Sequence, residues 1–424
     1  MTARRLAASW VLPIGRPPIR RGAVLLDARG RIAEVGPDAG VARPAGVPTE
    51  QLEGAALIPG LVNAHTHLEL TGLDAAVADP DFPAWIRRVI ALKAGRAPAQ
   101  VLEEARRGVV EGWSAGVTTV ADTGDSGAVV QALAELGGSG IAYHEIFGPD
   151  PATVHQRLEE YRRRFDELRA FTTRRVRLGV SPHAPYSVSG QLYAAVAAWA
   201  RSEGLPLAVH VAESAEEEEL LARGAGPFAE QWRARGIVPP AGRGTTPVEW
   251  LERHGVLGGR TLCIHAVRVD GADIARLAAH RCGVAHCPRS NRRHAGREAP
   301  LKALLDAGLP VGVGTDSVAS VNPLDLLAEA REARRLAGLD AAAALDLCTR
   351  SAARAIGLDD EVGALAPGKW GDIVAVSTPA AADGTGAEEA VLASGRDAVL
   401  ATWLSGREVY RADSRLTPHD PRRP

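Results

Sequence analysis

Apolar and polar residues follow three successive patterns along the 424-residue chain. Residues 1–57 consist of short β-rich runs separated by Gly and Pro, which is typical of a small antiparallel unit. Residues 361–424 return to short strands of the same kind. We expect these two terminal segments to pair in one small β-sandwich domain. Within the second segment, residues 378–393 are rich in Ala, Gly, Asp and Glu, and this composition predicts a mobile loop.

The middle segment, residues 58–360, has a different pattern. Eight apolar runs each precede a helical segment rich in Ala, Leu, Glu and Arg. The runs begin at Ile58, Val117, Ile141, Val176, Pro206, Thr261, Gly283 and Pro310. Eight β/α repeats predict an α/β fold, a closed (β/α)8 TIM barrel that forms one domain over residues 58–360.

The first of these runs ends in the pair His65 and His67. Side chains two apart on a strand point to the same face, so both imidazoles can reach one metal ion. An accidental pair on a solvated strand end is the alternative interpretation. The ends of the other runs decide between the two.

Active sites of (β/α)8 barrels lie at the C-terminal ends of the strands, and polar side chains gather there in this sequence. The candidates are His65, His67, His183, His210, His265 and Asp316. The chain has only 12 histidines, so five at these few positions favour a site over coincidence.

Neutral imidazoles and a carboxylate suit a zinc ion, and the same donors also suit iron. The candidates that match this donor set are His65, His67, His210 and Asp316. A bound metal ion lowers the pKa of water from about 15.7 towards roughly 7, so hydroxide exists at neutral pH. Four protein ligands and a water exceed the usual three-ligand catalytic zinc site. We therefore expect Asp316 to be a loose ligand that also accepts the proton of the water.

Composition narrows the choice of partner. The 49 basic and 51 acidic residues nearly balance, which gives no electrostatic footprint for a nucleic acid or an anionic membrane. No apolar stretch approaches the ~20 residues of a membrane span. The four cysteines lack paired spacing, which favours a reducing, cytoplasmic setting. A small-molecule substrate is therefore the expected partner.

The ordered motifs resemble the amidohydrolase superfamily, in its branch of cyclic-amidine deaminases and triazine hydrolases. The matching stretches are Pro59-Gly-Leu-Val-Asn-Ala-His-Thr-His, Ser181-Pro-His-Ala-Pro-Tyr-Ser, His210-Val-Ala-Glu-Ser, Ile264-His-Ala, Cys287-Pro-Arg-Ser-Asn, Gly314-Thr-Asp-Ser-Val-Ala-Ser and Gly363-Ala-Leu-Ala-Pro-Gly-Lys-Trp-Gly-Asp-Ile-Val. They cover almost the full length. The resemblance implies a metal-dependent hydrolase in which a metal-activated hydroxide attacks a ring carbon and ammonia is released.

The resemblance also implies roles for individual residues. Glu213 would protonate a ring nitrogen of the substrate, and Asp316 would relay the proton to the leaving ammonia. Glu213 could instead be the first charge of an acidic helix start, because residues 216–219 are all Glu. His265 would orient the hydroxide, with a satisfied core histidine as the alternative. His183 would touch the substrate or, alternatively, cap a turn.

Lysine is scarce in this chain. Only Lys93, Lys302 and Lys369 occur among the 49 basic residues. Binuclear relatives bridge two metals with a carboxylated lysine on the fourth barrel strand, which here ends Val180-Ser-Pro-His without one. The resemblance therefore implies a site for one metal.

Besides His183, four residues are candidates for contact with the substrate, each with a structural alternative. Glu69 shares the strand face of His67 and could contact a ring or an amino group, or be a strand-end charge. Trp85 matches a position where relatives stack a substrate ring, or it packs a helix. Asn291 and Ser320 could line the pocket or form turns.

Glu69 together with Cys287-Pro-Arg-Ser-Asn is most similar to the aminodeoxyfutalosine deaminases, which act on an adenine nucleoside. The glutamate with which S-adenosylhomocysteine deaminases hold the ribose is not obvious after Trp85. Other reactions on the same metal site are deamination of guanine or 8-oxoguanine, triazine dechlorination and cyclic-amide opening. A non-catalytic barrel scaffold is a remote alternative, because such scaffolds usually lose ligands. Related proteins frequently form homodimers, which makes a homodimer the candidate assembly.

Overall fold

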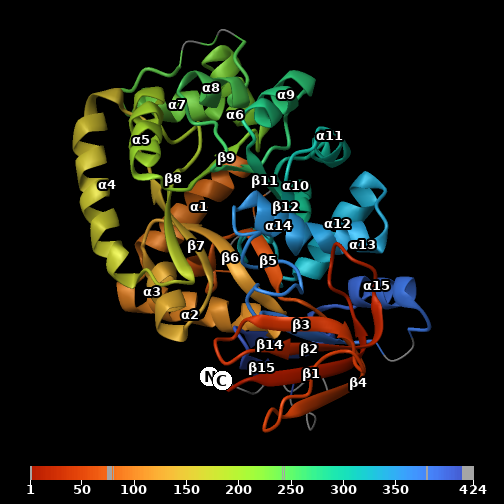
Figure 1. Cartoon of the computed structure of the whole chain (residues 1–424). Helices are drawn as coiled ribbons and strands as arrows, with labels where there is room; N and C mark the ends of the chain where they lie inside the picture. Colours follow the sequence, from red (N-terminus) through yellow and green to blue (C-terminus); the bar gives the residue numbers. More distant parts are fainter. Residues whose placement is uncertain are drawn as a thin grey trace.

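The computed structural model describes residues 2–73, 79, 81–240, 242, 244–378 and 381–412. Figure 1 shows a strand-and-helix barrel in the upper part of the view and a separate sheet below it. The red and blue ends of the sequence meet in that lower sheet.

Eight strands form the barrel sheet, and each pairs in parallel with the next along the chain. They are β5 (Leu61–Thr66), β6 (Val117–Gly124), β7 (Gly140–Ile146), β8 (Val176–Pro182), β9 (Leu207–Val211), β10 (Thr261–His265), β11 (Gly283–His286) and β12 (Val311–Val313). These strands coincide with the eight apolar runs, because parallel strands are buried on both faces and carry few polar residues. The predicted (β/α)8 barrel is confirmed.

Helices follow the strands and cover the outside of the barrel (Figure 1). The α-helices of this part are α1 (Phe82–Ala94), α2 (Pro98–Ser114), α3 (Ala128–Leu136), α4 (Val154–Leu168), α5 (Gly190–Glu203), α6 (Ala215–Arg223), α7 (Gly226–Ala234), α8 (Pro247–Arg253), α9 (Gly271–Ala279), α10 (Pro288–His294), α11 (Leu301–Asp306), α12 (Leu326–Ala337), α13 (Ala341–Leu347) and α14 (Arg350–Ala355). This part of the chain also contains three short 3-10 helices: η1 (Leu68–Leu70), η2 (Pro151–Thr153) and η3 (Arg169–Phe171).

Closure of the barrel brings the first and last strands together at the candidate site. Thr66 at the end of β5 forms a parallel bridge with Asp316, just after β12. The Asp316 N–H donates to the His65 carbonyl at 3.1 Å, and the Thr66 hydroxyl donates to the Asp316 carbonyl at 3.0 Å. The backbone pairing that closes the barrel therefore also places His65 beside Asp316.

The two terminal segments build one seven-stranded sheet in the order β15-β14-β13-β4-β1-β2-β3. Its strands are β1 (Arg4–Val11), β2 (Ile19–Leu26), β3 (Ile32–Pro37), β4 (Thr49–Pro59), β13 (Ile373–Ser377), β14 (Val399–Leu404) and β15 (Arg407–Arg411), with η4 (Arg396–Ala398) before β14. One apolar cluster joins both halves of this sheet and includes Leu6, Leu26, Leu57 and Trp403. The predicted association of the chain ends is thus present.

Part of the segment predicted as a mobile loop, residues 378–393, is instead helix α15 (Gly384–Ala393). The carboxylate of Asp383 caps this helix by accepting a backbone N–H of the first turn at 2.7 Å. Val391 and Leu392 of this helix are buried. The loop prediction was wrong because an alanine-rich helix with a narrow apolar face has nearly the composition of a polar loop.

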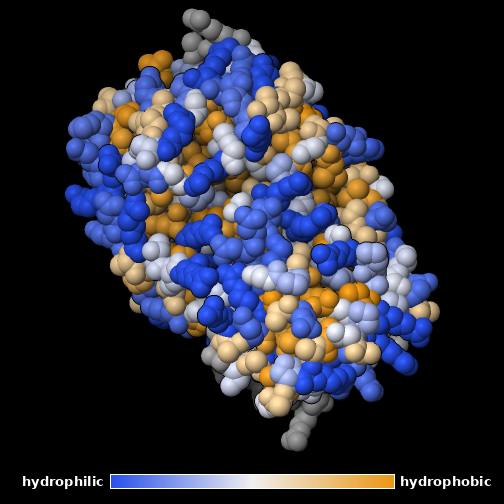
Figure 2. All heavy atoms as spheres, viewed as in Figure 1, coloured by the Kyte–Doolittle hydropathy of each residue, from blue (hydrophilic) through white to orange (hydrophobic). Residues whose placement is uncertain are grey.

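Figure 2 shows one face of the molecule, on which hydrophilic side chains alternate with small apolar areas. The four cysteines, Cys263, Cys282, Cys287 and Cys348, are buried and free. Within the described parts of the chain, no helix has the length and apolar character needed to cross a membrane.

A buried carboxyl on α12 predicts a pH-dependent stability. Glu329 is fully buried and accepts the backbone N–H of Arg289 at 2.9 Å. Burial raises its pKa from 4.5 to about 8, so folding favours the protonated form. The stability it contributes is complete below pH about 4.5 and is lost as the pH rises through about 8. In thermal unfolding, the Tm of Glu329→Gln should therefore fall less than the Tm of the wild type as the pH rises between these values. Curves of Tm against pH that run parallel for the two proteins would contradict this assignment.

Candidate active site

The four predicted metal ligands converge at the C-terminal ends of the barrel strands. His65 lies on β5 with His67 directly after it, His210 lies on β9, and Asp316 follows β12. Asp316 Oδ1 lies 3.7 Å from His65 Nε2 and 3.6 Å from His67 Nε2. The ring centroids of His65 and His210 are 5.0 Å apart. All four side chains therefore surround one small volume.

Two of the imidazoles are oriented by backbone carbonyls. His67 Nδ1 lies 2.8 Å from the Thr123 carbonyl, and His210 Nδ1 lies 3.1 Å from the His183 carbonyl. Because a carbonyl only accepts, each Nδ1 must carry the proton. The Nε2 lone pair of each ring is then available to a metal, as in many histidine metal sites.

The third imidazole, His65, is fully buried, and neither of its nitrogens has a hydrogen-bond partner in the described part of the chain. A buried polar group without a partner is costly and calls for an explanation. A metal ion that accepts a lone pair from His65 would provide that partner. The donor set of three imidazoles and one carboxylate therefore fits a divalent metal ion.

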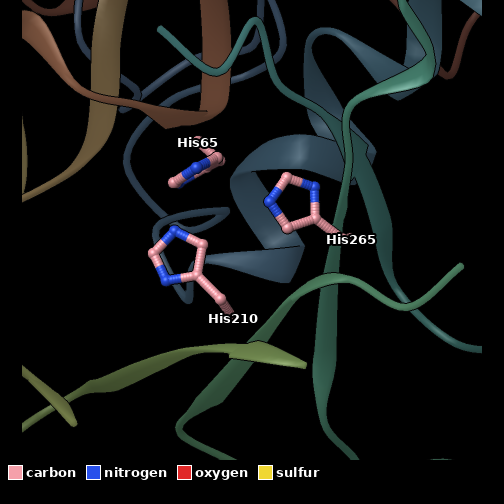
Figure 3. Close-up of side chains that lie close together, drawn as sticks. All are labelled: His65, His210 and His265. Carbon is pink, nitrogen blue, oxygen red and sulfur yellow. The ribbon is translucent and has the colours of Figure 1, made fainter. Parts of the chain in front are cut away.

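Protonation states agree with this fit. Burial lowers the pKa of His65 to about 3 and also lowers the pKa values of His67 and His210. The three rings are therefore neutral near pH 7, which is the state that a metal ligand needs. Figure 3 shows His65, His210 and His265 turned toward one another from β5, β9 and β10.

Glu213 and His265 form the next part of the site. His265 Nε2 lies 3.4 Å from Glu213 Oε1, and His265 Nδ1 lies 2.9 Å from Asn291 Oδ1. Burial, followed by the negative charge of Asp316, raises the pKa of Glu213 well above its ordinary value. Burial therefore favours the protonated form of Glu213, and Asn291 fixes the imidazole that contacts it.

The pKa of Asp316 is shifted in the opposite direction. Its carboxylate accepts the Ser290 hydroxyl at 2.6 Å and the Ser317 backbone N–H at 2.7 Å. Burial alone would raise its pKa, but the interactions with His65, His67 and His265 together outweigh burial and hold the pKa well below its ordinary value. The raised pKa of Glu213 and the lowered pKa of Asp316 are the divergence that acid–base chemistry requires.

Backbone strain marks the same positions. Ala212, His265 and Asp316 have positive φ angles of 54°, 73° and 58°. Left-handed backbone is unfavourable for residues other than Gly and persists only where the surrounding structure enforces it. The strain therefore coincides with the strand ends that aim Glu213, His265 and Asp316 into the site.

Residues 56–409 match the Amidohydrolase family. The chain belongs to the amidohydrolase family. It is 31% identical over 380 residues to a 5-methylthioadenosine/S-adenosylhomocysteine deaminase of Symbiobacterium thermophilum, covering 86% of this chain and 83% of that protein. It is 33% identical over 327 residues to an aminodeoxyfutalosine deaminase of Deinococcus radiodurans, covering 73% of this chain and 75% of that protein.

A solved structure extends the comparison. The zinc-bound adenosine deaminase of Xanthomonas campestris superposes with a TM-score of 0.83 at 26% identity, covering 99% of this chain and 95% of that chain. These relatives confirm the resemblance stated from the sequence. They also confirm the prediction of a hydrolytic enzyme that acts on C–N bonds.

The acidic run of this amidohydrolase contains a residue that the sequence did not single out. Glu217 is fully buried and accepts the backbone N–H groups of Ala212 at 2.8 Å and of Glu213 at 3.0 Å. Helix α6 starts only at Ala215, where Ser214 caps it. Glu213 therefore lies outside the helical first turn, and Glu217 holds the backbone that aims it.

We expect Glu217→Gln to lower turnover about tenfold without loss of metal. A glutamine has one acceptor oxygen, so one of the two backbone N–H groups would be left unpaired at a cost of about 1–3 kcal/mol. Ammonia-release kinetics and metal analysis check this. Glu218→Gln is the matched control, because Glu218 is an exposed partner of Arg268. Loss of metal in the Glu217 variant, or full turnover, would contradict the positioning role.

The predicted substrate contacts lie in different surroundings. His183 follows β8, with its ring centroid 4.8 Å from that of His210 and its Nδ1 2.8 Å from the Ser187 hydroxyl. Asn291 stands behind His265, as described above. Ser320 is fully buried in the turn after Asp316. His183 is thus the predicted contact placed directly beside the ligands.

Glu69 is buried, and its carboxylate is already engaged. It accepts hydrogen bonds from Lys93 Nζ at 2.8 Å and from the Ser126 backbone N–H at 3.2 Å. Lys93 Nζ also donates a hydrogen bond to Asp125 at 2.6 Å. Glu69 thus connects α1 to the mouth of the barrel through Lys93. Strand β8 carries no lysine, as the sequence indicated. The contact of Lys93, on α1, with Glu69 could not be predicted from the spacing of the two residues in the sequence.

Glu145 is a further buried carboxyl that the sequence prediction missed. It lies on β7, and its Oε1 is 4.0 Å from His210 Nδ1 and has no hydrogen-bond partner among the described residues. Burial raises its pKa well above the ordinary value and so favours its neutral form beside His183 and His210. Its signal was a polar residue at the end of the third apolar run.

Proposed function

We propose that this amidohydrolase is a metal-dependent deaminase of adenine nucleosides, with aminodeoxyfutalosine as the leading substrate. The observation that carries the proposal is the buried Glu213, in contact with His265, beside a cluster of three imidazoles and one carboxylate. The relatives named for deamination of 5-methylthioadenosine, S-adenosylhomocysteine and aminodeoxyfutalosine support the nucleoside class.

Ligands for one divalent ion are His65, His67, His210 and Asp316. When bound, the ion would act as a Lewis acid that polarises the attacking water. Zinc is the proposed ion, which the zinc-bound relative supports, although the donor set would also suit iron. The free, buried cysteines support the predicted reducing, cytoplasmic setting, and a homodimer is the proposed assembly.

In the proposed reaction, water adds to the ring carbon that carries the amino group, and the C–N bond then breaks. Glu213 holds its proton toward the neighbouring ring nitrogen and delivers it as the C–O bond forms. His265, fixed by Asn291, orients the water and Glu213. Asp316 takes one proton of the water and passes it to the amino group, which leaves as ammonia. The second proton of the water returns to Glu213 as the C=O bond forms. His183 would contact the substrate ring.

The test is a substrate panel assayed for ammonia and for product mass. It contains adenosine, 5'-deoxyadenosine, 5-methylthioadenosine, S-adenosylhomocysteine, aminodeoxyfutalosine, guanine, 8-oxoguanine and a chlorinated triazine. Ammonia release from adenine nucleosides, with an oxo group replacing the amino group, supports the proposal. Chloride release, ring opening, or ammonia from guanine compounds alone would overturn it.

A further inference from the structure

The side chain of Asn63 joins the two backbone segments that carry His65 and Asp316. Asn63 precedes His65 by two residues on β5, and Thr315 directly precedes Asp316. Asn63 Oδ1 accepts the Thr315 backbone N–H at 3.1 Å, and Asn63 Nδ2 donates to the Thr315 hydroxyl at 2.8 Å. The same Oδ1 accepts the His65 backbone N–H at 3.4 Å. One carboxamide therefore holds the first and the last strand end together.

A bulge in β5 explains why the strand uses a side chain here. Between the pairs Asn63–Val120 and Thr66–Asp122, two residues of β5 oppose one residue of β6. Such a bulge takes the extra residue out of the regular ladder and re-aims the neighbouring side chains. His65 is one of the two residues of the bulge, and Asn63 accepts its N–H. The bulge that turns the His65 imidazole into the site is thus stabilised by Asn63.

The segment after β12 is strained and lies close against β5. Asp316 has a φ of 58°, a conformation that persists only where the surrounding structure enforces it. Gly314 is so near that a Cβ added to it would lie 2.7 Å from the His65 nitrogen. Thr315 stands between these two positions, and Asn63 holds both its N–H and its hydroxyl. Asn63 therefore supplies part of the constraint on Asp316.

These hydrogen bonds are buried. Asn63 is 3% exposed and Thr315 is 2% exposed. Loss of the carboxamide would leave two buried backbone N–H groups unpaired, so the two segments would have to move to find other partners. Such a movement would change the spacing of His65 Nε2 and Asp316 Oδ1, which are 3.7 Å apart. One metal ion can contact both atoms only while they stay close.

We propose that Asn63 is a positioning residue for the metal site, which keeps His65 and Asp316 at the spacing that one divalent ion requires. This inference rests on the ligand set of the proposed function. Outer hydrogen-bond partners of metal ligands typically change metal affinity by about 10–100-fold. Asn63 acts through the backbone of two ligand segments, so its effect on the ion is indirect.

Zinc affinity, measured by competition with a chelator, tests this role. Asn63→Leu has a similar size but no hydrogen-bonding group, and it should weaken zinc binding about 10–100-fold. Asn63→Asp keeps acceptor oxygens for both N–H groups and should recover most of the affinity. Thr119→Val is the matched control, because Thr119 is also buried on a barrel strand and contacts the Ser139 hydroxyl at 3.3 Å. This control should bind zinc as the wild type does.

Two further measurements separate positioning from packing. The Tm of the metal-free protein should fall in both Asn63→Leu and Thr119→Val, because each loses a buried hydrogen bond. Only Asn63→Leu should change the visible absorption of the cobalt(II)-substituted protein, which reports the geometry of the ligands. Wild-type zinc affinity together with an unchanged cobalt spectrum in Asn63→Leu would overturn the inference. If Asn63→Leu does not fold, Thr315→Val decides: it removes only the hydroxyl partner of Asn63 and should give a smaller loss of affinity, and no loss would overturn the inference.

The outcome for Asn63 is distinguishable from the outcome for the proposed function, because neither zinc affinity nor the cobalt spectrum requires a substrate. A wild type that binds zinc but deaminates no adenine nucleoside would overturn the proposed reaction, and the Asn63 variants would still report on the metal site. A wild type that deaminates nucleosides while Asn63→Leu keeps full zinc affinity would overturn the inference alone. A wild type that binds no divalent metal would overturn both.

Discussion

Glu213→Gln is expected to lower turnover by at least about 10²-fold, the lower range of general acid–base contributions, while the enzyme keeps its metal. The amide preserves the size of the side chain and its contact distance to His265, but it cannot deliver a proton. The physical reason is that burial raises the pKa of Glu213, which favours its protonated form, while the pKa of the neighbouring Asp316 is lowered. The measurement is the rate of ammonia release together with the metal content of the purified variant.

The matched control for this variant is Glu216→Gln. Glu216 belongs to the first turn of α6, where an acidic side chain stabilises the helix without reaching the site. Its replacement should leave turnover close to that of the wild type. If Glu213→Gln instead retained near-normal turnover, Glu213 would have no part in the reaction and the proposed mechanism would fail.

The sequence predicted the barrel and the six polar candidates His65, His67, His183, His210, His265 and Asp316, because both predictions depend on where the strands end. Each predicted ligand follows an apolar run, and parallel strands present their C-terminal ends at one mouth. His65 and Asp316 meet because the first and last strands must pair when the sheet closes. The order of the strands alone therefore predicts most of the residues that meet at the site.

Features that depend on helices returning across the mouth could not be predicted in the same way. Lys93 reaches Glu69 from α1, and His294 reaches Trp85 from α10. No spacing rule states which helix residue will face a given strand end, since this depends on the tilt and length of each connection. The same limit explains why Glu217 was grouped with a solvated acidic run, although it is the buried member of that run.

Removing a metal ligand should abolish metal retention and turnover together, in contrast to Glu213→Gln. His67→Ala is the preferred variant, because the side chain of His67 is 15% exposed and those of His65 and Asp316 are 0% and 6% exposed. Solvent can therefore fill the space left by the ring. Loss of an outer hydrogen-bond partner alone costs about 10–100-fold in metal affinity or activity, so loss of a ligand should cost more than about 100-fold.

His155→Ala provides the control for nonspecific effects, because that side chain is 91% exposed on α4. Metal content by elemental analysis and ammonia release would be measured on all three proteins, before and after chelation and zinc restoration. Zinc should restore the chelated wild type and the His155 variant, but not the His67 variant. A His67 variant that kept stoichiometric metal and turned over normally would remove His67 from the ligand set. The orientation of its ring by the Thr123 carbonyl would then be only structural.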